Sequence, residues 1–304
     1  MTTAASARRR HEKCPLCGSS VLRILIRDGD LPTPGPVLTC RECDLVFFRD
    51  MGFDENYWKK GEHVALYDEA KDTLVKEFQS YLLALRAACP QRGKLLDIGC
   101  GLGEFIGLAQ TDGWRVEGVE PGERAVEVLR AKTPATIHHG YFEQLTLPVQ
   151  GYDCLTMWDV IEHLYEPNAA LAKAAEVLPP GGLLVFKTPN ERSLFKRLPL
   201  FLYRMTGGHF KSFLKYVYYD PHYYSYSLRC CRHMLARHGF TIERVLREAT
   251  DIEWARRKLD LSYSKYRVTV TLVKLLLPLA VLLARLTGRE NKIIVLARKQ
   301  PAAG

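Results

Sequence analysis

The sequence predicts an α/β fold in which a doubly wound, parallel sheet follows a small cysteine-rich module. Two observations support this fold class. From residue 94 onward, short apolar runs alternate with segments of helical periodicity, at the spacing typical of parallel strands joined by crossover helices. Before them, residues 14–48 carry two pairs of closely spaced cysteines around a proline-rich turn. A chain of 304 residues is long enough for one large core and one small appendage.

The pattern places the elements and divides the chain. Strands are expected at 95–98, 115–119, 152–157, 183–187, 240–247 and 293–297, and helices at 68–88, 104–110, 122–132, 167–178 and 228–239. The chain is divided into a disordered basic tail (1–13), a zinc ribbon (14–48), a helical connector (49–92) and the α/β domain (93–304), which includes a basic aromatic segment (192–226) and an apolar helical insertion (about 262–289) before the last strand. A ligand of this sheet is expected outside the carboxyl ends of its strands.

Composition and charge narrow the class of protein. The apolar and charged fractions are those of an ordinary soluble protein, which argues against a disordered chain or a polytopic membrane protein. The formal net charge of +9 suits an anionic partner, such as a phosphorylated substrate or a membrane surface. Nucleic acid is not expected as a partner, because residues 16–45 carry no dense basic patch. The first ten residues lack the apolar core of a secretory signal, so a cytoplasmic location is expected, with membrane association as an alternative.

The cysteine-rich module has the pattern of a zinc site. Cys14 and Cys17 form one CxxC pair, and Cys40 and Cys43 form another. Two such pairs bring four thiolates to one tetrahedral zinc ion. Because cysteine occupies all four positions, the site is closed and is expected to be structural.

A glycine-rich turn follows the first strand of the sheet. The run from Leu95 to Gly103 leads from an apolar strand through three glycines into a helix, whose N-terminus offers free N–H groups. Such a turn alone also occurs in dinucleotide enzymes, and so does an acid such as Glu120 at the end of the second strand. Asp97 discriminates, because a carboxylate repels a pyrophosphate and attracts a sulfonium or an amino group.

Three motifs resemble those of one enzyme family. The run 95–103 resembles motif I of class I S-adenosylmethionine-dependent methyltransferases. Residues 152–164 resemble the fourth strand and following helix of the ubiquinone-biosynthesis O-methyltransferase type, and 178–185 resemble the turn before strand five. The resemblance covers about residues 80–250. It implies a Rossmann-like methyltransferase domain that binds S-adenosylmethionine.

The resemblance also implies a set of cofactor-binding residues. The glycines would line the methionine portion, Asp97 would support the site near it, and Glu120 would take the ribose. Many members of the family have an aspartate where this chain has Tyr141, so the adenine contact is assigned to Phe142 or its backbone. The expected cofactor-binding residues are Asp97, Gly99, Cys100, Gly101, Gly103, Glu120, Pro121, Phe142, Trp158 and Asp159, the last two bordering the cofactor and the substrate mouth.

Two histidines are candidates for a general base. Imidazole titrates near neutral pH, so His163 or His222 is suited to take the proton of an acceptor hydroxyl. The alternative is that His163 orients a local helix and that His222 is a packed loop residue. The expected reaction is O-methylation of a small-molecule, glycan or lipid-linked acceptor.

Three other functions remain as alternatives. A zinc ribbon before a methyltransferase domain resembles the arrangement in sugar C-methyltransferases. A nicotinamide-dependent oxidoreductase and a non-catalytic zinc-ribbon scaffold also remain open. The sequence does not indicate the acceptor or the oligomeric state.

The apolar stretch 268–286 leaves two interpretations open. Lys274, Pro278 and Arg285 interrupt it, and its longest uncharged run is too short for a comfortable membrane span. One interpretation is a buried or dimer-forming helix. The other, slightly favoured, is a helix that lies in a membrane interface, with its basic residues near lipid phosphates.

Overall fold

The computed structural model describes residues 7–33, 35–53, 62–211, 214–218, 222–249, 251–253, 255–256 and 267–301. Five segments expected from the sequence lie partly outside the described residues. These are the basic tail (1–6), the zinc ribbon (34), the connector (54–61), the basic aromatic segment (212–213 and 219–221) and the apolar insertion (262–266).

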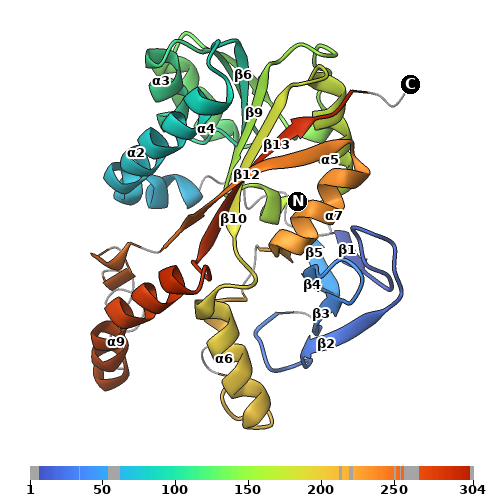
Figure 1. The fold of residues 1–304 in the computed structure, drawn as a ribbon, viewed down its shortest axis with the longest axis vertical. Coiled ribbons are helices and arrows are strands. Elements are labelled where there is room, and N and C mark those ends of the chain that lie inside the picture. Colours follow the sequence, from blue (N-terminus) through green and yellow to red (C-terminus); the bar gives the residue numbers. More distant parts are fainter. Residues whose placement is uncertain are drawn as a thin grey trace, which may run out of the picture.

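A seven-stranded sheet forms the centre of the molecule (Figure 1), in the order β12-β13-β10-β9-β6-β7-β8. Its strands are β6 (Lys94–Ile98), β7 (Arg115–Glu120), β8 (Thr136–His139), β9 (Cys154–Trp158), β10 (Leu183–Pro189), β12 (Phe240–Glu248) and β13 (Lys292–Lys299). The neighbouring strands β10, β9, β6, β7 and β8 run parallel to one another, and β13 is antiparallel to both of its neighbours. The sheet is therefore mostly parallel, and β8 is a strand that the sequence pattern did not predict.

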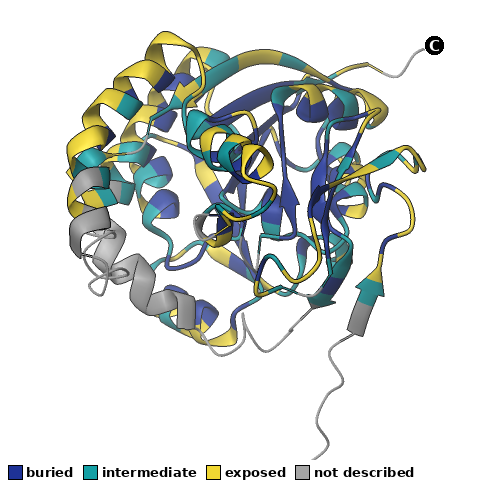
Figure 2. Ribbon diagram, turned by 90° about the horizontal axis from the view of Figure 1, so that it is seen from below, coloured by how far each residue is buried: buried dark blue, intermediate teal, exposed yellow. Residues whose placement is uncertain are grey.

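Helices cover both faces of this sheet. On one side lie α2 (Glu62–Ala88), α3 (Glu104–Thr111) and α4 (Glu123–Lys132), and on the other lie α5 (Pro167–Val177) and α7 (Leu228–Arg237) (Figure 1). Leu155 and Met157 of β9 belong to one hydrophobic cluster, whereas Cys154 and Trp158 belong to the other. Strands buried on both faces read as continuous apolar runs, which is why the sequence pattern located them. Figure 2 shows the strands buried at the centre and exposed residues on the surrounding helices.

The N-terminal module is a second sheet, in the order β11-β4-β3-β2. Its strands are β2 (Leu22–Ile26), β3 (Val37–Cys40), β4 (Val46–Phe48) and β11 (Tyr224–Ser225). The last of these comes from the α/β domain: Tyr224 pairs with Phe47, and Ser225 with Val46. The N-terminal module is therefore not a separate appendage.

The described part of the predicted disordered tail is ordered. Strand β1 (Ala7–Arg10) pairs antiparallel with β5 (Asp50–Phe53), and the His11 ring lies edge-on to Phe47 at 5.8 Å. Arg9 forms an ion pair with Glu166. A charged segment with a strand to pair with and an acid to neutralise it does not behave as a solvated tail.

Two further helices lie beyond the end of the sheet at which the parallel strands terminate. Helix α6 (Leu194–Met205) begins at Ser193, whose hydroxyl accepts the backbone N–H of Lys196. Helix α9 (Arg267–Leu286) precedes β13. Among the described residues, neither helix, nor any other, is long and apolar enough to cross a membrane.

Candidate active site

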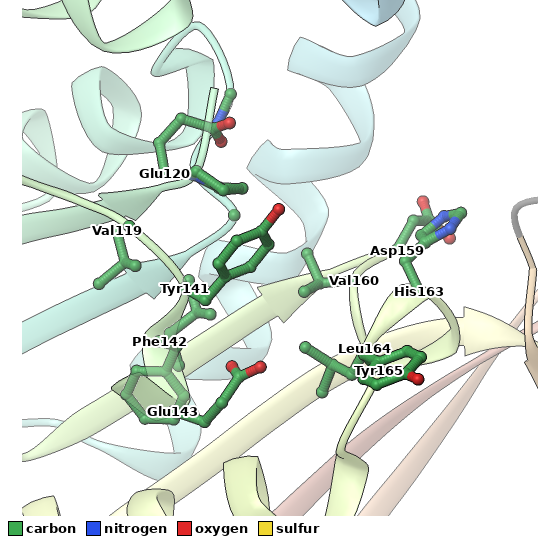
Figure 3. Close-up of a pocket in the computed structure, with 15 residues that line it drawn as sticks. Val119, Glu120, Tyr141, Phe142, Glu143, Asp159, Val160, His163, Leu164 and Tyr165 are labelled. Carbon is green, nitrogen blue, oxygen red and sulfur yellow. The ribbon is translucent and has the colours of Figure 1, made fainter. Parts of the chain in front are cut away.

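A pocket lies at the carboxyl ends of β6, β7 and β9, where the order of the strands reverses between β6 and β9. Its empty space, open solvent at the mouth included, amounts to about 730 Å³. Figure 3 shows Glu120 at one end, Asp159 and His163 at the other, and the Tyr141 ring between them. The pocket therefore joins the glycine turn to His163.

The glycine turn forms the wall beneath this pocket. Gly99 has a φ of +69°, and a Cβ built on it would lie 2.6 Å from Cγ2 of Val160, which also lines the pocket. Gly103 has a φ of +83° and precedes α3, so that the turn runs directly into a helix N-terminus. L-residues avoid these backbone angles, and the missing side chains leave backbone exposed to a ligand.

Glu120 fixes the turn and faces the pocket. One of its carboxylate oxygens accepts the backbone N–H of Gly101 at 2.9 Å, and the other accepts that of Gly122 at 2.8 Å. Its side chain is buried, and burial raises the pKa of the carboxyl despite the two N–H groups. A carboxylate held in this way presents its remaining lone pairs to hydroxyl groups in the pocket.

Asp97 lies behind the turn and does not line the pocket. The residue is 1% exposed, and its Oδ1 accepts the Thr156 hydroxyl at 2.6 Å. Burial, assisted by the charge of Glu120, raises the pKa of Asp97 to about 7, although the Thr156 hydrogen bond opposes the shift. A nearby cation would favour the ionised carboxylate.

The other end of the pocket begins at Asp159, which has a left-handed backbone (φ +53°). Its Oδ2 lies 2.9 Å from Nζ of Lys187 and 3.0 Å from Nζ of Lys292. Lys187 is fully buried and also forms an ion pair with Glu77 at 2.8 Å. Against the effect of burial, the two ammonium groups hold the pKa of Asp159 well below its ordinary value. Asp159 is therefore a fixed anion beside the pocket.

His163, His222 and Glu162 form a cluster beside Asp159. The two imidazole rings are edge-to-face with centroids 4.6 Å apart, and donor atoms of all three residues lie within 4.8 Å of one another. Burial, the neighbouring His163 and Lys196 lower the pKa of His222 well below its ordinary value. Burial and the charge of Asp159 raise the pKa of Glu162 to about 8. The cluster therefore holds a neutral imidazole next to a carboxyl that titrates near neutrality.

Comparison with known proteins identifies the fold that carries this pocket. Residues 67–245, more than half of the chain, match the family model described as a methyltransferase domain. The chain belongs to this methyltransferase family. Its domain is a class I S-adenosylmethionine-dependent methyltransferase domain, as the motifs in the sequence had indicated.

Two curated relatives share part of the domain. A probable S-adenosylmethionine-dependent methyltransferase of Mycolicibacterium smegmatis is 31% identical over 138 residues, which cover 45% of this chain and 47% of that protein. A ubiquinone biosynthesis O-methyltransferase of Aromatoleum aromaticum is 30% identical over 103 residues, which cover 32% of this chain and 44% of that protein. The chain thus matches less than half the length of these relatives.

A solved structure shares the fold. The SAM-dependent methyltransferase of Thermotoga maritima is 19% identical, with a TM-score of 0.52, over 81% of this chain and all of that one. This likeness bears on the fold alone.

The methyltransferase domain places most of the predicted site residues in or behind the pocket. Gly99, Gly101, Glu120, Pro121, Phe142, Asp159 and His163 line it. Cys100 and Gly103 belong to the turn but do not line the pocket, and His222 reaches it through its contact with His163.

Trp158, another predicted site residue, lies outside the pocket. It does not line the pocket, and its ring stacks on Tyr81 at 4.8 Å and packs edge-on against Phe105 at 4.9 Å. Successive side chains of a strand point to opposite faces. Trp158 is the last residue of β9 and belongs to the hydrophobic cluster of Phe78 and Phe105, so its ring lies beneath α2 and α3.

Several residues around the site were not predicted from the sequence. Glu143, Leu164 and Tyr165 line the pocket, and Lys187 and Lys292 neutralise Asp159. Leu164 ends the run 152–164 that carries the family resemblance, whereas Lys187 and Lys292 belong to no motif with a recognisable spacing. The composition of β10 gives one signal, because Lys187 interrupts its apolar run and a buried lysine requires a partner.

The four cysteines of the N-terminal module converge. Sγ of Cys14 lies 3.6 Å from that of Cys43, Sγ of Cys17 lies 3.6 Å from that of Cys40, and all four lie within 4.8 Å of one another. A tetrahedral zinc ion with Zn–S bonds of about 2.3 Å separates its sulfurs by about 3.8 Å. The donor set therefore fits zinc. Cys230 of α7 lies next to Cys43, so the cluster adjoins the methyltransferase domain.

Proposed function

We propose that the protein transfers a methyl group from S-adenosylmethionine to a hydroxyl of a small-molecule, glycan or lipid-linked acceptor. One observation carries the proposal: His163 lines the same pocket as the glycine turn and Glu120. A single cavity thus joins a site for an adenosine-type cofactor to an imidazole. The family match favours this reaction over the nicotinamide-dependent oxidoreductase.

The residues at one end of the pocket fit the cofactor. S-adenosylmethionine, when bound, supplies a methyl group on a positively charged sulfur. Gly99 and Gly101 leave room for it along the turn, and Glu120 faces the position where ribose hydroxyls would be bound. Asp97 adds a negative charge behind the turn, which favours a cation in the pocket. These groups hold the reacting centre in place, and positioning is the main contribution of a protein to an in-line transfer.

The residues at the other end fit an acceptor hydroxyl. His163 would accept the proton of an acceptor hydroxyl that takes up the methyl group. His222 packs against this ring, and its lowered pKa keeps it neutral at physiological pH, so that it does not repel the imidazolium that forms. Asp159 lies beside His163 (Figure 3), and its carboxylate is held there by Lys187 and Lys292. His222 is the alternative base, since it has the same chemistry in the same cluster.

We further propose that Cys14, Cys17, Cys40 and Cys43 bind a structural zinc ion. The four thiolates leave no open coordination position for substrate. The zinc ion would stabilise the fold of the N-terminal module, whose sheet includes β11 of the methyltransferase domain.

Calorimetry and a labelled-methyl assay test the proposal. The protein should bind S-adenosylmethionine and not NAD, and a non-catalytic scaffold would bind neither well. Fractionated metabolite and lipid extracts, incubated with protein and labelled methyl donor, should yield a product whose label lies on oxygen. A label on carbon would favour the C-methyltransferase alternative, and no labelled product from any fraction would contradict the enzyme.

The base is tested by substitution. The His163→Ala variant should lose roughly 100-fold or more in kcat, while its affinity for S-adenosylmethionine stays within about twofold, because His163 lies at the far end of the pocket from Glu120. The His222→Ala variant is the comparison. If only that variant loses turnover, His222 is the base, and if neither does, the assignment of a histidine base is wrong.

A further inference from the structure

Helix α9 carries an apolar face that is largely exposed among the described residues. Leu275, Leu279, Leu282 and Leu286 are 73%, 53%, 51% and 74% exposed. Their spacing of three and four residues puts them on one side of the helix. An isolated exposed leucine needs no explanation, but a continuous stripe of them marks a surface that binds something apolar.

The opposite side of α9 attaches the helix to the protein. Leu277, Val281 and Ala284 are buried and share the complementary spacing. The helix is therefore apolar on both sides, and only one of these sides is used in packing. A helix made solely to complete the core would have a polar outer face.

Helix α6 presents a second exposed apolar face next to the first. Leu198, Phe201 and Met205 lie at helical spacing and are 53%, 58% and 69% exposed. The two helices are in contact, and the backbone N–H of Leu194 donates to the carbonyl of Arg289 at 3.0 Å. Both project from the same end of the molecule (Figure 1). Of the thirteen large hydrophobic residues that are exposed in the described part of the chain, nine belong to these two helices.

The charged residues of α6 and α9 indicate which partner the exposed apolar faces bind. Neither α6 nor α9 contains an aspartate or a glutamate, whereas Arg197, Arg204, Lys274 and Arg285 belong to them. A second copy docked on the same face would bring these positive charges together. An anionic lipid surface accepts the apolar side chains below its headgroups and the basic ones at its phosphates.

We propose that the exposed faces of α6 and α9 form a docking surface for an anionic lipid membrane. The helices lie in the interface and do not span it, which agrees with the absence of a spanning helix among the described residues. This inference concerns binding and does not depend on the methylation reaction.

The docking surface adjoins the end of the sheet where the pocket opens. Helix α6 follows the carboxyl end of β10, and β13 begins shortly after α9 with Lys292, which pairs with Asp159 in the pocket wall. A docked protein would thus hold its acceptor end near the lipid. If the proposed methyl transfer also holds, a lipid-linked acceptor is the class favoured among the three.

Vesicle co-sedimentation of the full chain tests the docking surface. Wild-type protein should bind vesicles of phosphatidylcholine mixed with phosphatidylglycerol, bind pure phosphatidylcholine weakly, and dissociate as salt is raised. The triple variant Leu275→Gln, Leu279→Gln, Leu282→Gln should lower the partition coefficient by roughly 100-fold. The matched control is Ile24→Gln, Leu83→Gln, Val149→Gln, which removes three equally exposed apolar side chains elsewhere and should leave binding unchanged.

Two further measurements separate the outcomes. Unchanged affinity for S-adenosylmethionine shows that a variant is folded, and the pair Phe201→Gln, Met205→Gln provides a second test should the triple variant not fold. Equal binding by wild type, variants and control would overturn the proposal. So would a wild-type dimer in sedimentation velocity that the α9 substitutions dissociate, because the face would then be an interface between copies.

Discussion

Replacing Asp97 by asparagine should stabilise the ligand-free protein at high pH while weakening cofactor binding. Asp97 is 1% exposed, and burial raises its pKa from 3.8 to about 7. The folded protein therefore binds this proton more tightly than the unfolded chain does. The stabilisation from this group is fully present below pH 4 and is lost as pH rises through about 7.

The magnitude follows from the interval between the two pKa values. An interval of about three pKa units corresponds to about 4 kcal/mol of unfolding free energy at pH 8. About 3 kcal/mol of this develops between pH 5 and the folded-state pKa near 7. The Asp97→Asn variant avoids this loss, because the amide carries no charge and its carbonyl oxygen still accepts the Thr156 hydroxyl.

Urea unfolding at pH 5 and pH 8 measures the effect. The difference in unfolding free energy between the Asp97→Asn variant and wild type should grow by up to about 3 kcal/mol between these pH values. Using the difference cancels the contributions of Glu120 and Glu162, whose pKa values are also raised. In calorimetry the same variant should bind S-adenosylmethionine at least roughly tenfold more weakly, through loss of the attraction to its positive charge. If the difference in unfolding free energy between the Asp97→Asn variant and wild type is the same at pH 5 and pH 8, the reasoning is wrong.

Two further predictions concern the ends of the pocket. Glu120→Ala should raise the Kd for S-adenosylmethionine by roughly 100-fold or more. The substitution removes the acceptor for the ribose hydroxyls and leaves the N–H groups of Gly101 and Gly122 without their partner. An unchanged Kd in calorimetry would show that the cofactor does not bind at Glu120. Lys187→Met should lower the free energy of unfolding by about 3 kcal/mol, because Glu77 and Asp159 lose the buried cation between them. The double variant Lys187→Met, Glu77→Gln should recover part of that loss in urea unfolding.

Local patterns made the core of the fold predictable. The apolar runs located six of the seven strands of the central sheet, and Ser227 marked the start of α7, where its hydroxyl accepts the backbone N–H of Cys230. The glycine turn was predictable because a positive φ, as at Gly99, favours glycine over other residues, and glycines can be located directly in the sequence. The fold class and the cofactor end of the pocket thus depend on short-range signals.

Long-range pairings were not predictable in the same way. Strand β11 has two residues and pairs with β4 more than 170 positions away, so no periodicity marks it. The partners of Asp159 are equally remote, and nothing local shows that Lys187 and Lys292 meet there. The tail at Ala7–Arg10 was expected to be disordered because its composition is basic, yet pairing with Asp50–Phe53 orders it.

Removing the proposed zinc ion should impair turnover more than cofactor binding. Strand β11 begins two residues after His222 and is held by the ribbon strand β4. Next to it, the carbonyl of Tyr223 accepts the backbone N–H of Phe48, and the Tyr224 hydroxyl donates to the carbonyl of Tyr165 in the pocket wall. The ribbon therefore supports the acceptor end, and in the part of the chain that the structure describes it makes no such hydrogen bond to the glycine turn.

Chelation measures this coupling. After removal of zinc, kcat should fall and the KM for the acceptor should rise, while the Kd for S-adenosylmethionine stays within about threefold, because ribbon folding depends on the metal and the turn does not. The Cys17→Ser variant should behave in the same way, and Cys89→Ser, which alters a cysteine outside the cluster, is its control. Loss of cofactor affinity in step with turnover would show that the ribbon stabilises the whole domain and not the acceptor end alone.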